Sequence, residues 1–139
     1  MNSPTPLNLV GTWSYKALDT VPEHQGVFHI TKDFIYVSIQ KYSDMISKNN
    51  PEGLLPQRYK LHFESNDMFQ MIQPKKSQGP IHYFSFSGSE LLLRRESDQM
   101  RWSCRQIDQS QAPPWFFPML DRVLSKPWPN AEQDAAANP

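Results

Sequence analysis

Eight short segments of alternating apolar and polar residues constrain this chain more than any other feature of its sequence. Side chains of a β-strand point alternately to the two faces of a sheet, so this alternation predicts half-buried strands. Tight turns join most of the segments, which predicts an antiparallel meander. The segments are residues 12–18, 26–31, 34–40, 58–64, 68–72, 81–86, 90–95 and 100–105.

The clearest alternation runs through residues 58–64, where Tyr59, Leu61 and Phe63 are separated by charged or polar residues. We expect these three side chains to point to the core and their neighbours to face solvent. A meander of about eight strands leaves exposed edges unless it closes on itself. The sequence therefore predicts an all-β fold, a closed antiparallel up-and-down barrel of about eight strands.

A helix is expected after the last strand. Pro118 suits the first turn of a helix, and Phe116, Leu120, Val123 and Leu124 then share one helical face. The 139 residues suffice for one domain. We expect an arm at residues 1–8, the barrel with its helix at 9–128 and a disordered tail at 129–139. An α+β cone, as in polyketide cyclases and steroid isomerases, is a rival fold, but it normally leads with helices, whereas this chain leads with strands.

Composition excludes several classes of partner. Lys plus Arg and Asp plus Glu both number 14, so the chain lacks the basic footprint of a nucleic-acid binder. No apolar run approaches the roughly 20 residues of a membrane span. The opening residues lack the basic start and apolar stretch of a secretory signal, and the single Cys104 permits no internal disulfide. We therefore expect a cytoplasmic protein.

Gly11 and Trp13 open the first predicted strand with a glycine, one spacer and a tryptophan. Together with about eight strands and a final helix, this pattern resembles the lipocalin-like barrels of the calycin superfamily. The resemblance implies that Trp13 closes one end of the barrel, with Arg101 or Arg105 of the last strand packed across its ring. It also implies a central cavity that takes a small molecule.

Three functions of different classes are compatible with such a barrel. The first is non-covalent binding of a hydrophobic or aromatic small molecule in the cavity. The second is a cofactor-free cyclase, isomerase or lyase that acts on a hydrophobic metabolite there. The third is a protein-interaction module whose barrel is filled. We expect no cofactor, and no metal site because the four histidines are scattered along the chain.

Aromatic side chains are the candidates for ligand binding. Tyrosine hydroxyls can orient a polar group of a ligand while the rings pack on its apolar surface. The alternative is that these side chains only fill the barrel, as in many small barrels. The predicted ligand-binding residues are Tyr15, Tyr36, Tyr59, Phe63, Phe84 and Trp102.

His82 and Tyr83 are the candidates for catalysis. His82 shares one strand face with Phe84 and Phe86, which favours an inward position for all three. An inward histidine could act as a general acid or base, whereas the alternative is a histidine at the rim or surface. Only one of His82 and Tyr83 can point inward from a regular strand.

Three other features of the sequence leave alternative interpretations open. Arg94 could hold a ligand carboxylate if it pointed inward, but the alternation favours Leu91 and Leu93 as the inward pair. Residues 42–57 are long for a hairpin loop, which predicts a lid or rim of the cavity mouth. The aromatic segment 115–117 with residue 128 is expected to pack the helix on the barrel, with a homodimer contact as the alternative.

Overall fold

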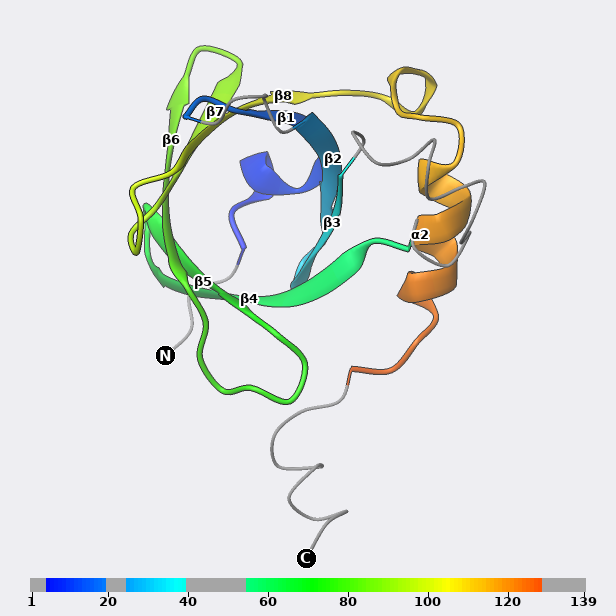
Figure 1. Ribbon diagram of the computed structural model, residues 1–139, viewed down its shortest axis with the longest axis horizontal. Helices are drawn as coiled ribbons and strands as arrows, with labels where there is room; N and C mark the ends of the chain where they lie inside the picture. The colour runs from blue at the N-terminus through cyan, green and yellow to red at the C-terminus, as the bar shows by residue number, and fades with distance from the viewer. Residues whose placement is uncertain (1–4, 20–24, 40–54, 129–139) are drawn as a thin grey trace, which may run out of the picture.

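The computed structural model describes residues 5–19, 25–39 and 55–128. Eight strands form one closed antiparallel barrel in which each strand pairs with its neighbours in sequence and β1 pairs with β8 (Figure 1). This confirms the predicted fold class and is compatible with a lipocalin-like fold. The elements are η1 (Leu7–Leu9), β1 (Gly11–Ala17), β2 (Gln25–Ile30), β3 (Phe34–Ile39), β4 (Gln57–Ser65), β5 (Met68–Ile72), β6 (Ile81–Ser87), β7 (Glu90–Arg95), β8 (Arg101–Gln106), η4 (Gln109–Gln111) and α2 (Phe116–Leu124).

Strand β4 follows the predicted alternation. Leu61 and Phe63 are buried inside the barrel, and Tyr59 packs partly buried against the same core. On the other face, Nε2 of His62 lies 3.2 Å from Oε1 of Glu64. The predicted register of this strand is therefore confirmed.

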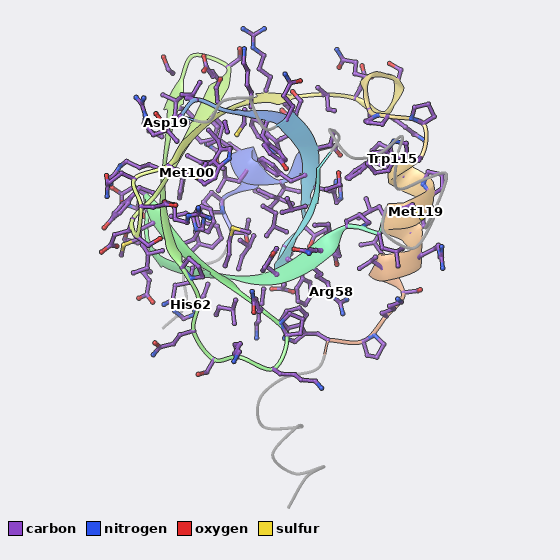
Figure 2. All side chains as sticks on the ribbon, viewed as in Figure 1. Asp19, Arg58, His62, Met100, Trp115 and Met119 are labelled. Carbon is purple, nitrogen blue, oxygen red and sulfur yellow. The ribbon has the colours of Figure 1, made fainter. Side chains whose placement is uncertain are left out.

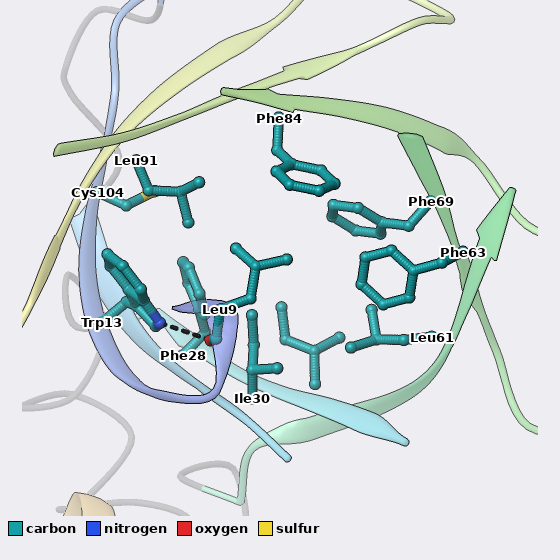
Figure 3. Close-up of a cluster of buried hydrophobic side chains, with 11 residues drawn as sticks. Leu9, Trp13, Phe28, Ile30, Leu61, Phe63, Phe69, Phe84, Leu91 and Cys104 are labelled. Atoms are coloured by element: carbon teal, nitrogen blue, oxygen red, sulfur yellow. Dashed lines mark hydrogen bonds between the residues drawn. The ribbon is translucent and has the colours of Figure 1, made fainter. Parts of the chain in front are cut away.

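One end of the barrel, here named the closed end, is covered by η1. Leu9 is buried among the inward side chains, and its carbonyl oxygen accepts a hydrogen bond of 2.9 Å from Nε1 of Trp13 (Figure 3). The Trp13 ring is 2 % exposed and lies 6.4 Å from the ring of Phe28 and 6.3 Å from that of Phe86. Trp13 thus closes the barrel, as the resemblance implies.

The prediction that Arg101 or Arg105 packs across the Trp13 ring is wrong. Arg101 lies at the opposite end of β8, where its Nη2 is 2.9 Å from Oδ1 of Asp19. Arg105 pairs with Ser14, so its exposed side chain lies on the outer face of the sheet while Trp13 points inward. Because side chains alternate along a strand, both guanidinium groups lie on the outer face of the barrel, away from the Trp13 ring inside it.

Helix α2 lies outside the barrel, beside β2 and β3 (Figure 1). Phe116, Leu120 and Val123 of the helix are buried against Val27 of β2 and Tyr36 of β3. The expected packing of the helix on the barrel wall is confirmed. It gives β2 and β3 a second apolar face, which a barrel strand in contact with water lacks.

Arg58 of β4 binds the chain that follows α2 through ring contacts and hydrogen bonds, here named together the clasp. The guanidinium lies 5.3 Å from the ring centre of Phe34 and 5.2 Å from that of Trp128. It donates hydrogen bonds of 2.7 and 2.8 Å to the carbonyl oxygens of Lys126 and Pro127. Figure 2 shows Arg58 outside the barrel, on the side of α2.

We expect Arg58→Met to lower the free energy of unfolding by roughly 1 kcal/mol. The substitution removes a half-exposed guanidinium together with its two hydrogen bonds and two ring contacts. Urea denaturation measures the change. Lys60→Met, on the same outer face of β4, is the matched control and should change the stability by less than about 0.5 kcal/mol. Equal effects of the two substitutions would contradict the clasp.

Candidate functional site

A cavity of about 200 Å³ lies inside the barrel at the end opposite η1, here named the open end. Half of its ten lining side chains are wholly apolar, and the other half carry an imidazole, two phenols, an indole and a guanidinium. The lining residues are Tyr15, Phe28, Ile35, Val37, Tyr59, Met71, His82, Leu93, Arg95 and Trp102.

Three phenylalanines fill the barrel toward the closed end. The ring centres of Phe63, Phe69 and Phe84 lie 5.4 to 6.0 Å apart. Phe63 and Phe84 point inward as expected, but they pack within this cluster and are not among the residues that line the cavity. The barrel is therefore packed toward its closed end and hollow toward its open end.

Tyr36 lies outside the barrel, so its predicted place in the cavity is wrong. Its neighbours Ile35 and Val37 line the cavity, and alternation points Tyr36 to the other face of β3. There its ring is 3 % exposed, in one cluster with Val27 and Phe116. The sequence could not separate the two faces of β3 because both are apolar.

His82 points into the barrel, as the alternation predicts. It is 6 % exposed, and its ring is stacked on Phe69 at 5.4 Å, with Trp102 at 6.1 Å. Burial lowers the pKa of His82 to about 4; the charge of Arg95 acts in the same direction, and the hydrogen bond to Pro80 opposes it. The imidazole is thus neutral at pH 7.

The tautomer of His82 follows from its hydrogen bond to the backbone. Nδ1 lies 3.2 Å from the carbonyl oxygen of Pro80, which can only accept. In the neutral ring Nδ1 therefore carries the hydrogen, and Nε2 keeps an unshared electron pair. The cavity thus contains a neutral hydrogen-bond acceptor.

Tyr83 points away from the cavity. Its hydroxyl donates a 3.2 Å hydrogen bond to Oε2 of Glu96, and the guanidinium of Arg94 lies 4.5 Å above its ring. The choice between His82 and Tyr83 therefore falls on His82, and the placement of Tyr83 at the site is wrong. Leu91 and Leu93 point inward, so Arg94 belongs to the outer face, as the alternation favoured.

Tyr15 and Tyr59 both line the cavity, as predicted. The Tyr15 hydroxyl donates to the carbonyl oxygen of Ser38 at 2.8 Å, past Gly26, where a Cβ atom would lie 2.5 Å from that hydroxyl. The Tyr59 hydroxyl lies 2.6 Å from Oε1 of Gln57. Burial raises the pKa of Tyr15 to about 12 and also raises that of Tyr59, so both phenols stay protonated.

Arg95 is a cavity residue that the sequence analysis missed. Its guanidinium lies 5.3 Å from the ring centre of Trp102, which lines the cavity as expected. Two hydrogen bonds, of 3.0 and 2.6 Å, join Arg95 to the carboxylate of Asp98 and lower the pKa of Asp98 to about 2. The alternation in β7 did indicate this position, because Arg95 follows Leu91 and Leu93 at an interval of two residues and therefore shares their inner face.

Two predicted segments fall largely on residues that the structure does not describe. Residues 42–54 of the expected lid and the expected tail at 129–139 lie outside the described residues. Leu55 packs against the cluster under α2. The lid stays a prediction.

Comparisons of the chain with protein-family models, curated proteins and solved structures found no match. In residues 5–19, 25–39 and 55–128, no helix combines the length and the apolar character needed to cross a bilayer. Within the same ranges, no three His, Cys, Asp or Glu side chains gather in a way that could hold a metal ion. We therefore infer the chemistry of the site from its own geometry.

Proposed function

We propose that this protein binds a small hydrophobic or aromatic molecule, without covalent chemistry, in the cavity at the open end of the barrel. The observation that supports the proposal is the cavity itself, a hollow in an otherwise packed barrel with a mostly apolar lining. Burial of apolar ligand surface in such a hollow is favourable by about 25 cal/mol per Å².

The size of the cavity limits the ligand. A cavity of roughly 150 Å³ with an apolar lining admits one benzene ring, and sites for drug-sized molecules measure about 300–1,000 Å³. At about 200 Å³, the cavity suits one substituted ring or a small bicyclic molecule. A long-chain lipid would extend beyond this volume, through the open end of the barrel.

The alternative of a cofactor-free enzyme is less favoured by the same residues. Proton transfer is most efficient when the pKa of the catalytic group lies near the working pH. The pKa of His82 is lowered to about 4 and that of Tyr15 is raised to about 12, so neither group is poised for transfer near pH 7. A filled barrel that serves only interactions is less favoured because the open end is hollow.

Three further parts of the proposal extend beyond the site. Kinship with the calycins is supported by the barrel topology and by Trp13 at its closed end. A cytoplasmic location is supported by the single Cys104, which is buried and forms no internal disulfide. A homodimer through the half-buried Trp115 and Phe117 is a separate proposal, which sedimentation velocity would test.

Leu93→Trp is expected to weaken binding of a bicyclic aromatic probe such as naphthalene at least about tenfold, because the indole would occupy the cavity. Isothermal titration calorimetry measures the affinity, and a negative heat-capacity change would mark apolar burial. Leu92→Trp, one residue away on the outer face, is the matched control and should bind like the native protein. Val37→Phe is a second blocking variant.

Two results would contradict the proposal. One is that naphthalene and smaller aromatic probes show no saturable binding to the native protein. The other is that Leu93→Trp and Val37→Phe, shown to be folded by their melting curves, bind the probe as well as Leu92→Trp does.

A further inference from the structure

Several hydrogen-bond donors of the cavity lining, those of Tyr15, Tyr59, His82 and Arg95, are directed at acceptors of the protein. The hydroxyl of Tyr15 and Nδ1 of His82 each face a backbone carbonyl oxygen, at 2.8 and 3.2 Å, and a carbonyl can only accept. The guanidinium of Arg95 donates to the carboxylate of Asp98. These donors already have partners within the protein, whereas Nε2 of His82 is an acceptor that the lining offers to a guest.

Nε2 of His82 is the strongest acceptor of this set. It lies on the edge of the imidazole away from Nδ1, and thus away from the carbonyl of Pro80 that holds Nδ1. His82 is among the residues that line the cavity, so a guest that lies against the imidazole can donate to Nε2. A guest without a donor would cover this electron pair and leave it unpaired.

Flat rings form the walls beside this acceptor. The His82 ring is stacked on Phe69 with an angle of 10° between the planes, and the Trp102 ring lies 6.1 Å from it, tilted by 38°. Tyr15 and Phe28 form a second stacked pair in the lining, at 5.9 Å. Aromatic guests gain from offset stacking and edge-to-face contacts with such walls.

Charge selects among aromatic guests as well. The cationic Arg95 beside His82 disfavours a guest cation, and an anion would have to compete with the carboxylate of Asp98 for that guanidinium. A neutral guest avoids both costs, since burial of a charge without a partner is unfavourable.

We propose that the ligand is a small neutral aromatic molecule with one ring hydroxyl or ring N–H group, whose hydrogen is donated to Nε2 of His82. This inference rests on the proposed function, because it names the class of molecule that the same cavity takes. His82 is then a specificity-determining residue of a binding site, and no proton is transferred.

The test compares indole with indene, which has the same bicyclic carbon frame with a CH₂ group in place of the N–H. Calorimetry at pH 7.5 gives the dissociation constants of both probes for the native protein and for His82→Phe, which keeps a ring to stack on Phe69 but has no acceptor. The ratio of the indene constant to the indole constant should fall roughly three- to tenfold in His82→Phe. A ratio between variants cancels the difference in the water solubility of the two probes.

His62→Phe is the matched control, because His62 lies on the outer face of β4 beside Glu64 (Figure 2). It should leave the ratio at the native value. His82→Leu provides the same comparison if His82→Phe does not fold.

The outcomes separate the two proposals. If neither probe binds the native protein, the proposed function fails for this class of molecule. If both probes bind and the ratio is the same in the native protein, His82→Phe and His82→Leu, the function stands and the role of His82 is wrong. Retained indene binding with a reduced indole preference supports both.

Discussion

Trp13→Ala is expected to lower the free energy of unfolding by about 3–5 kcal/mol, the usual range for removal of a buried large aromatic side chain. The ring fills the closed end of the barrel between Phe28 and Phe86. Its Nε1 also satisfies the carbonyl oxygen of the buried Leu9, which the substitution would leave without a partner. Both losses occur where η1 meets the barrel.

Urea denaturation of the native protein and of two variants measures this effect. Trp13→Phe keeps much of the ring volume and removes only the donor, so it should destabilise the protein less than Trp13→Ala does. Trp115→Ala removes a half-buried indole outside the barrel and is the control for loss of a tryptophan. An alanine variant at position 13 as stable as the native protein would rule out the closing role of Trp13.

Most of the fold could be predicted from the sequence because water contacts one face of most strands. In β4 the polar residues between Tyr59, Leu61 and Phe63 mark the solvent side without ambiguity. In β3 the same reasoning fails, because α2 covers the outer face and Tyr36 there is as buried as Ile35 inside. Alternation in a strand indicates its two faces, but only polarity indicates which face is the core.

The candidate site was predicted in part for related physical reasons. His82 and Tyr83 were an either-or choice by alternation, and burial of Phe84 on the same face decides it. The partners of the cavity groups could not be predicted, because they are backbone carbonyl oxygens, such as those of Ser38 and Pro80, which any residue carries. The pattern of residue types in a sequence therefore does not indicate such partners.

Acidification is expected to destabilise the protein through His82 by on the order of 3 kcal/mol between pH 7.5 and pH 4. Burial beside Phe69 lowers the pKa of His82 from 6.5 to about 4 in the folded protein. Between these two values the unfolded chain binds a proton at this histidine and the folded protein does not. Stability therefore falls as the pH drops through this range, and the contribution of His82 is fully present above about pH 6.5.

His82→Phe isolates this contribution, because it keeps a ring at the site and removes the titration. The difference in unfolding free energy between pH 7.5 and pH 4, measured by urea denaturation, should be smaller in the variant by on the order of 3 kcal/mol. Burial also lowers the pKa of His29, but that group is present in both proteins and cancels in the comparison. The carboxylate of Asp98, whose pKa is about 2, stays ionised across this range. If the native protein and the variant lost equal stability on acidification, the imidazole of His82 would have to be solvated, and a buried neutral acceptor in the cavity would be excluded.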